Sequence, residues 1–248
     1  MNELVADEKL KIRETLWNAM EERGIARFPR PVYNRIPNFV GSENAAQRLI
    51  GIKEYKNTHT IFCNPDSPQR AVREHILRDG KILIMAPPRL KVNGFLVLNK
   101  KSIPHDKIRK ASTIKGAFQF GRIVKPNALE KIDLKIAGSV AVDTKGGRVG
   151  KGGGYSDLEF AILTEYGLID RTARVLTTVH EVQIVENIPM IAHDVPLDIV
   201  ITPSHVIYTE TVYQKPQGIL WELLPDAKIS SIPLLKELKS RSQLRSSP

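Results

Sequence analysis

Short apolar segments rich in β-branched residues alternate along this chain with segments of helical periodicity. Residues 60–63 and 81–85 have the composition of strands, and residues 69–78 between them have that of a helix. Because strand–helix–strand units pair their strands in parallel through right-handed crossovers, the pattern predicts an α/β fold with a mainly parallel sheet. Further strands are predicted at 96–98, 136–142, 173–178 and 197–201, the last with a hairpin partner at 206–209.

The chain is long enough to bury one substantial hydrophobic core. Its 248 residues predict a single domain over 1–239, which opens with a helix at 7–27, and a frayed Ser- and Arg-rich tail at 240–248. The sequence has no run of eighteen apolar residues and no signal peptide, so we expect a cytoplasmic protein without a membrane partner. The one cysteine, Cys63, can form no internal disulfide and is expected to be buried.

The stretch from Ala141 to Asp157 joins a strand-like run to a loop rich in glycine and cations. It reads Ala-Val-Asp-Thr-Lys-Gly-Gly-Arg-Val-Gly-Lys-Gly-Gly-Gly-Tyr-Ser-Asp and leads into a predicted helix. Glycines let backbone N–H groups converge on phosphate oxygens, and Lys145, Arg148 and Lys151 add charge-assisted contacts. The spacing fits neither common nucleotide-binding motif, and a mobile surface turn is the alternative. A position between strand and helix, where α/β proteins bind anions, favours a polyphosphate site.

The loop carries a longer pattern, Asp143-x-x-Gly-x-Arg148-Val-Gly150-x-Gly152-x-Gly154-Tyr155-Ser156-Asp157. It resembles the signature of the 5-formyltetrahydrofolate cyclo-ligase (methenyltetrahydrofolate synthetase) family, which reads Asp-x-x-Gly-x-Arg-Leu-Gly-x-Gly-x-Gly-Tyr-Tyr-Asp. Two further segments fit the family, Lys9-x-x-x-Arg13 and His193-Asp194-x-x-x-Asp198 followed by Ile201-Thr-Pro203. The resemblance covers about residues 7–205 and implies a three-layer α/β sandwich.

The resemblance implies an ATP- and magnesium-dependent ligase that converts 5-formyltetrahydrofolate to 5,10-methenyltetrahydrofolate through a phosphorylated formyl group. ATP and a reduced folate or related pterin are the implied partners. Arg148 and Tyr155 would be catalytic, Asp66 and Tyr155 would contact the folate, and Asp157 and Asp194 would hold Mg²⁺. The residues implied to contact ATP are Lys9, Arg13, Arg148, Gly150, Lys151, Gly152, Gly153, Gly154, Tyr155 and Asp157.

Two departures from the family pattern leave the substrate open. Ser156 stands where the family has a second tyrosine, which removes an aromatic wall from the expected folate pocket. Asp66 stands in place of a glutamate, within an Asn64-Pro-Asp-Ser-Pro-Gln69 turn that is similar to a divergent branch of the family. The alternative role for this turn is to cap the following helix. A second hypothesis therefore keeps the ATP site and changes the substrate to another pterin or heterocycle.

The formal net charge of +10 indicates anionic partners. ATP and a polyglutamylated folate satisfy this, whereas nucleic acid is disfavoured because the basic residues are spread along the chain with few aromatic residues beside them. A non-catalytic, RNA-associated binding protein is the third hypothesis. His193 and Asp198 are both expected to be structural, since a lone histidine beside a strand is usually hydrogen-bonded and Asp198 begins an apolar strand.

Overall fold

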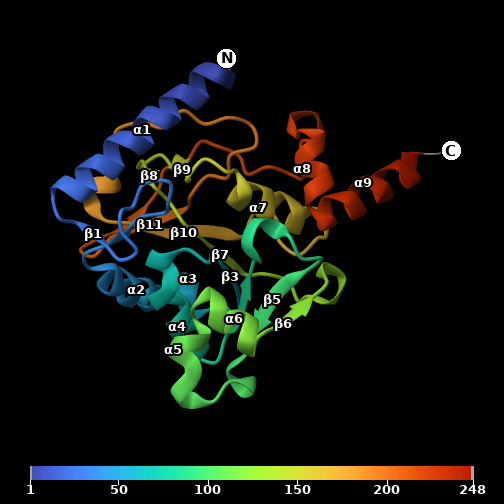
Figure 1. The fold of residues 1–248 in the computed structure, drawn as a ribbon, viewed down its shortest axis with the longest axis horizontal. Coiled ribbons are helices and arrows are strands. Elements are labelled where there is room, and N and C mark those ends of the chain that lie inside the picture. Colours follow the sequence, from blue (N-terminus) through green and yellow to red (C-terminus); the bar gives the residue numbers. More distant parts are fainter. Residues whose placement is uncertain (1, 247–248) are drawn as a thin grey trace.

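The computed structural model describes residues 2–246, and an eight-stranded sheet forms the centre of this part of the chain (Figure 1). The strand order is β12-β11-β10-β7-β3-β4-β5-β6. Strands β11 to β4 in this order pair in parallel, while β12, β5 and β6 are antiparallel to their neighbours at the two edges. The parallel strands are β11 (Ile199–Ile201), β10 (Arg174–Thr178), β7 (Leu134–Ala137), β3 (Thr60–Cys63) and β4 (Ile82–Met85), and the antiparallel ones are β12 (Val206–Tyr208), β5 (Phe95–Leu98) and β6 (Arg122–Val124).

Helices cover both faces of the sheet, which gives three layers. Successive residues of a strand point to opposite faces, so Ile61 and Cys63 of β3 belong to one hydrophobic cluster and Phe62 to the other. The first cluster contains residues of α1 (Asn2–Glu22), α2 (Ser42–Gly51), α3 (Lys53–Lys56), α4 (Arg70–Arg78), α5 (Ile108–Ala111) and α6 (Ile114–Phe120). The second contains residues of α7 (Tyr155–Glu165), α8 (Asp226–Ser231) and α9 (Pro233–Ser246). The predicted fold class, a three-layer α/β sandwich with a mainly parallel sheet, is confirmed.

Two small antiparallel ribbons lie outside the central sheet. One pairs β1 (Ala26–Arg27) with β2 (Asn38–Phe39), and the other pairs β8 (Ala141–Val142) with β9 (Arg148–Val149). The strand predicted at 136–142 is therefore wrong as one element. It divides into β7 and β8, because the ladder with β10 ends at Ala137 and residues 138–140 redirect the chain.

The helices differ from the sequence predictions in three further places. Helix α1 spans 2–22 rather than 7–27, and it ends before a turn in which Gly24 has a φ of 65°. The short helices α5 and α6 were not predicted; Thr113 caps α6 by accepting a hydrogen bond from the Gly116 amide at 3.0 Å. Residues 240–246, expected to fray, continue helix α9, while 247–248 lie outside the described residues.

The length and hydrophobicity of the helices decide whether any of them could cross a membrane. Within residues 2–246, no helix combines the length and the apolar character that crossing a bilayer requires. Cys63 is fully buried, as expected, and burial raises the pKa of its thiol to about 11.

Candidate active site

The glycine-rich loop leaves the β8–β9 ribbon and enters helix α7 directly. The turn of the ribbon is built around Asp143, whose Oδ1 accepts hydrogen bonds from the Lys145 amide at 2.9 Å and the Gly147 amide at 2.7 Å. After β9, Gly152 and Gly154 have φ values of 103° and 64°, a region that other residues rarely adopt. These glycines let the chain turn sharply into the first turn of α7, so the loop lies at a helix N-terminus.

Helix α1 packs against this loop and supplies two cations. Arg13 donates from Nε to the Gly150 carbonyl at 2.7 Å, and Lys9 forms an ion pair with Asp194. The Asp194 carboxylate also accepts from the Ile191 amide at 2.8 Å. Lys9 is only 8% exposed whereas its apolar neighbour Leu10 is 46% exposed. The first half of α1 therefore turns Lys9 rather than Leu10 inward, and the helix brings the two predicted cations to the loop.

Arg148 and Asp157 form a second ion pair at the loop. The Arg148 guanidinium also donates to the Gly138 carbonyl at 3.2 Å, and Asp157 accepts from the Val195 amide at 3.0 Å. Burial opposes ionisation of Asp157, but the charge and hydrogen bonds of Arg148 outweigh it and lower the pKa of this carboxyl. The same pairing raises the pKa of Arg148 against its own burial. Both groups are held charged inside the protein.

The two predicted metal ligands, Asp157 and Asp194, each engage one oxygen in an ion pair and a backbone hydrogen bond. Within residues 2–246, Oδ2 of Asp157 and Oδ1 of Asp194 make no hydrogen bond or ion pair. Among residues 2–246 no group of three or more His, Cys, Asp and Glu is placed to hold a metal. Two hard oxygens fit Mg²⁺ only if phosphate oxygens and water complete its shell, which is the usual composition of Mg²⁺ sites.

A polar cleft of about 650 Å³ opens on one side of the loop. Lys151 and Asp66 both line it and form an ion pair, with a distance of 3.0 Å between Lys151 Nζ and Asp66 Oδ1. Asp66 makes no hydrogen bond that would cap the following helical turn, so the capping alternative is wrong for its side chain. Tyr155, at the first position of α7, also lines this cleft, and Arg35 and Arg89 add positive charge at its rim.

The floor of the cleft is a hydrogen-bonded network that begins at Ser156. Its hydroxyl donates to Oδ1 of Asn64 at 2.8 Å, and Asn64 donates from Nδ2 to Glu159 Oε2 at 2.6 Å. Lys135 Nζ donates to the same Glu159 oxygen at 3.2 Å and lies 4.2 Å from the centre of the Phe62 ring. Ser156 is therefore a member of a buried polar network and not simply a missing aromatic wall.

Sequence reasoning missed Glu159 and Lys135, although a signal was present. Lys135 interrupts the apolar strand Leu134-Lys-Ile-Ala137, and a lysine inside a buried strand requires a partner. Glu159 follows Ser156 by three residues, so the two side chains share one face of α7. Burial raises the pKa of Glu159 and lowers that of Lys135, so each group is disfavoured in its charged form in spite of the other.

Residues 5–203 match the model of the 5-formyltetrahydrofolate cyclo-ligase family. The chain belongs to this family. The matched segment contains most of the strands of the sheet and both ion pairs of the loop. The match confirms the resemblance noted in the sequence.

Similar family members exist among vertebrate proteins. The methenyltetrahydrofolate synthase domain-containing protein of Mus musculus is 39% identical over 241 residues, which make up 95% of this chain and 64% of the mouse protein. Its Homo sapiens counterpart is 37% identical over 242 residues, 95% of this chain and 62% of that protein. The chain thus spans slightly less than two thirds of the length of these relatives.

A solved structure supports the same fold. The NMR structure of Aquifex aeolicus 5,10-methenyltetrahydrofolate synthetase superposes with a TM-score of 0.52 at 18% sequence identity. The alignment covers 83% of this chain and 94% of the Aquifex protein. At this identity the likeness establishes the cyclo-ligase fold alone.

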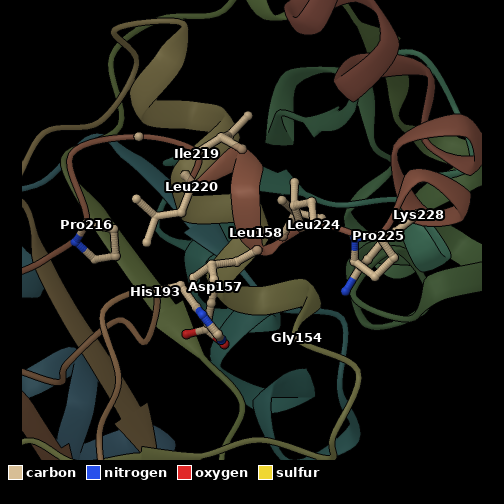
Figure 2. Close-up of a pocket in the computed structure, with 13 residues that line it drawn as sticks. Gly154, Asp157, Leu158, His193, Pro216, Ile219, Leu220, Leu224, Pro225 and Lys228 are labelled. Carbon is tan, nitrogen blue, oxygen red and sulfur yellow. The ribbon is translucent and has the colours of Figure 1, made fainter. Parts of the chain in front are cut away.

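Asp198 and His193, at the two ends of the second family segment, have different surroundings. Asp198 accepts from the Val175 amide at 2.7 Å and is ion-paired with Lys215 at 2.7 Å and Arg174 at 3.0 Å. These contacts join β10, the start of β11 and the segment after β12, as expected of a structural residue. His193 is exposed and lines a separate small pocket with Asp157 and Gly154 (Figure 2).

Proposed function

We propose that this family member catalyses ATP-dependent cyclisation of 5-formyltetrahydrofolate to 5,10-methenyltetrahydrofolate. The observation that carries the proposal is the convergence of helix α1 and the glycine loop at the N-terminus of α7. Arg13 arrives from α1, Arg148 from β9, and the loop itself opens into the N-terminus of α7 beside a polar cleft. Such an arrangement suits a polyphosphate at the loop and a second, polar substrate in the cleft.

The reaction needs a leaving group on the formyl carbon. The formyl oxygen attacks the γ-phosphorus of ATP and ADP leaves; N10 then attacks the formyl carbon, its proton is lost, and phosphate departs with the former formyl oxygen. Little covalent chemistry falls to the protein in phosphoryl transfer, which depends on alignment and on stabilisation of charge. Arg148 and Arg13 are the side chains at the loop that would stabilise the transferring phosphoryl group, and the amides of residues 150–154 would orient it.

A magnesium ion bound with ATP would neutralise charge on the phosphates and bridge their oxygens. Asp157 and Asp194 are the residues that would hold it. Lys9 and Arg148 keep these carboxylates at the loop through their ion pairs. If these cations bound phosphate oxygens instead, Asp194 and Asp157 would still be held by their backbone hydrogen bonds to Ile191 and Val195.

In the cleft, Tyr155 and Asp66 would contact the reduced folate. Tyr155 lies between the loop and the cleft, so its ring is placed to flank the formyl group. Asp66 is fixed by Lys151 and lies against the Gly138 backbone, where a Cβ on residue 138 would be 2.8 Å from Asp66 Oδ2. A carboxylate held in this way could accept hydrogen bonds from the donor edge of a pterin.

A second candidate function keeps the ATP site and changes the substrate to another pterin or heterocycle. The observation that favours it is the network of Ser156, Asn64 and Glu159 at the floor of the cleft. A polar floor discriminates between ring edges by hydrogen bonding, whereas an aromatic wall accepts any flat ring.

The test is the absorbance of the methenyl product with purified protein, Mg²⁺, ATP and 5-formyltetrahydrofolate. We expect turnover, and Arg13→Ala should weaken ATP binding about tenfold because a charge-assisted contact is lost. Lys11→Ala, which removes an exposed cation from the same helix, is the matched control and should bind ATP like the parent. Absence of product at saturating ATP and folate would reject the cyclo-ligase proposal. Retained ATP binding in that case would favour the altered substrate.

A further inference from the structure

We propose that residues 216–228, which follow the family-matched part of the chain, build a pocket for the base of the bound nucleotide and supply Lys228 as an additional phosphate-binding cation. The inference rests on the proposed use of a nucleoside triphosphate at the loop. It assigns residues 216–228 to that substrate, and this segment lies outside the family match of 5–203.

The pocket lies on the side of α7 away from the polar cleft and has a volume of about 120 Å³. Its walls are apolar side chains of α7 and of the 216–228 segment, and only Asp157, His193 and Lys228 contribute ionisable groups (Figure 2). The pocket and the cleft both contain Gly154 and Asp157, so a ligand on the loop can extend into either. The apolar residues of the pocket are Leu158, Ala161, Pro216, Ile219, Leu220, Leu223, Leu224 and Pro225.

The small pocket and the polar cleft differ in chemistry, and this difference indicates which one binds the nucleotide base and which one binds the folate. A purine ring is flat, uncharged and largely apolar on its faces, so it suits a small pocket lined by leucine and proline side chains. A reduced folate carries polar ring edges and an anionic glutamate tail, for which the larger cleft with Asp66, Arg35 and Arg89 is suited. The base is therefore assigned to the pocket.

Direct contacts hold the 216–228 segment in place. Lys215, just before it, is ion-paired with Asp198 at 2.7 Å, and the Ile219 amide donates to Glu165 Oε1 at 2.9 Å. Gly218 has a φ of 156°, and a Cβ there would lie 2.5 Å from the same Glu165 oxygen. The hydrogen bond of Ile219 fixes the pocket wall to the end of α7 before any ligand binds, and residue 218 has a φ that glycine adopts more readily than other residues.

Lys228 reaches the loop from α8. Its Nζ donates to the Gly153 carbonyl at 2.9 Å and lies 5.0 Å from the centre of the Tyr155 ring. Arg13 makes the equivalent contact with the Gly150 carbonyl, at the start of the same loop. Lys228 and Arg13 therefore contact carbonyls near the two ends of the loop.

These two cations differ from Lys9 and Arg148 in having no carboxylate partner. Lys9 is paired with Asp194 and Arg148 with Asp157, but within the described chain no carboxylate lies within ion-pair distance of Arg13 or Lys228. Burial lowers the pKa of both, because a charge removed from water without a close counterion is unfavourable. An anion on residues 150–154 would supply the missing charge to both at once, which is the independent indication of a phosphate ligand.

Titration calorimetry with ATP and with inorganic tripolyphosphate separates the base from the phosphates. Lys228→Met should weaken both ligands about tenfold, because both carry the phosphates. Ala161→Leu fills the pocket and should weaken ATP about tenfold or more while tripolyphosphate binds as before. Lys236→Met, which removes an exposed lysine of α9, is the control and should change neither affinity.

Leu223→Ala provides a second test of the pocket, because Leu223 is 41% exposed at its rim and its truncation should leave the fold intact. It should weaken ATP a few-fold and leave tripolyphosphate unchanged. Parent-like ATP binding by both pocket variants would overturn the base assignment while the proposed function stands, and parent-like tripolyphosphate binding by Lys228→Met would overturn the role of Lys228. Failure of the parent to bind ATP at all would instead reject the proposed function together with this inference.

Discussion

Two buried ion pairs lie close to the start of helix α7, and burial affects them in opposite ways. In the pair of Arg148 and Asp157, the pKa of the arginine is raised and that of the carboxyl is lowered. In the pair of Lys135 and Glu159, the lysine pKa is lowered and the carboxyl pKa is raised. The first pair is stabilised in its charged form, whereas burial disfavours the charged form of both members of the second pair.

The difference follows from the surroundings of each carboxylate. Asp157 is 14% exposed and accepts from the Val195 amide besides Arg148, so its charge is supported from two directions. Glu159 is 6% exposed, and its Oε2 accepts from both Lys135 and the neutral Asn64. The cost of removing its charge from water is therefore larger than the stabilisation that these two partners give to that charge. A charged pair beside a phosphate loop can respond to a charged ligand, while a pair near neutrality at the cleft floor is suited to hydrogen-bonding a neutral ring.

The largest expected effect is that of Asp157→Asn. It leaves Arg148 buried without a counterion, which should destabilise the protein by about 3–5 kcal/mol in chemical denaturation. Adding Arg148→Met should recover part of this loss, because no charge then remains buried. Asp226→Asn, at a carboxylate that is 94% exposed, should change stability very little. Parent-like stability of Asp157→Asn would show that Arg148 is not held by this pair.

A smaller loss is expected for Lys135→Met at the cleft floor. Glu159 can become protonated when its partner is removed, since burial already raises its pKa, so we expect a destabilisation of about 1–3 kcal/mol. Lys135→Met combined with Glu159→Gln should be closer to the parent than the single variant. If Lys135→Met is as damaging as Asp157→Asn in the same denaturation experiment, the two pairs do not differ as described.

How much of this site the sequence could predict depends on the kind of signal. The ordered motif from Asp143 to Asp157 identified the loop, because glycine and charge spacing there reflects backbone geometry that the sequence records directly. The parallel sheet also followed from local patterns. The ion pair of Lys9 with Asp194 could not be predicted, since it depends on helix α1 and residues 191–195 meeting in space, and that of Arg148 with Asp157 depends on the path of the loop between them.

The cleft floor was missed for another reason. In the sequence, Ser156 stands out only as the loss of a tyrosine. Its hydrogen-bond partner Asn64 lies 92 residues earlier in the chain, so the network between them has no local sequence signal. Lys135 inside an apolar strand was the one local sign that a buried partner existed, and nothing in the sequence identified that partner as Glu159. The 216–228 segment likewise carries no motif, and its place beside the loop depends on tertiary contacts.

The opposite pKa shifts predict opposite dependences of stability on pH. Asp157 has a lowered pKa, so its contribution is complete above the ordinary value of 3.8 and is lost as pH falls below it. Glu159 has a raised pKa, so its contribution is complete below 4.5 and is lost as pH rises through the folded-state value. Denaturation across this range should show that Asp157→Asn removes the acid-side loss and Glu159→Gln removes the opposing slope. Identical pH profiles for the two variants would contradict the comparison.

The smallest effect is expected at Ser156, where the network reaches the cleft. Ser156→Ala removes one hydrogen bond to Asn64 and should destabilise the protein by about 0.5–1.5 kcal/mol. Ser156→Tyr restores the residue found in the family but breaks the same bond, and it should leave Asn64 Oδ1 with only the Gly138 amide, at 3.2 Å, as a donor. We therefore expect the tyrosine to weaken folate binding in calorimetry rather than to tighten it, with the Ala variant as control for loss of the bond alone. Tighter folate binding by Ser156→Tyr would mean that the cleft still accommodates the family's aromatic wall, and that the polar floor has no part in substrate choice.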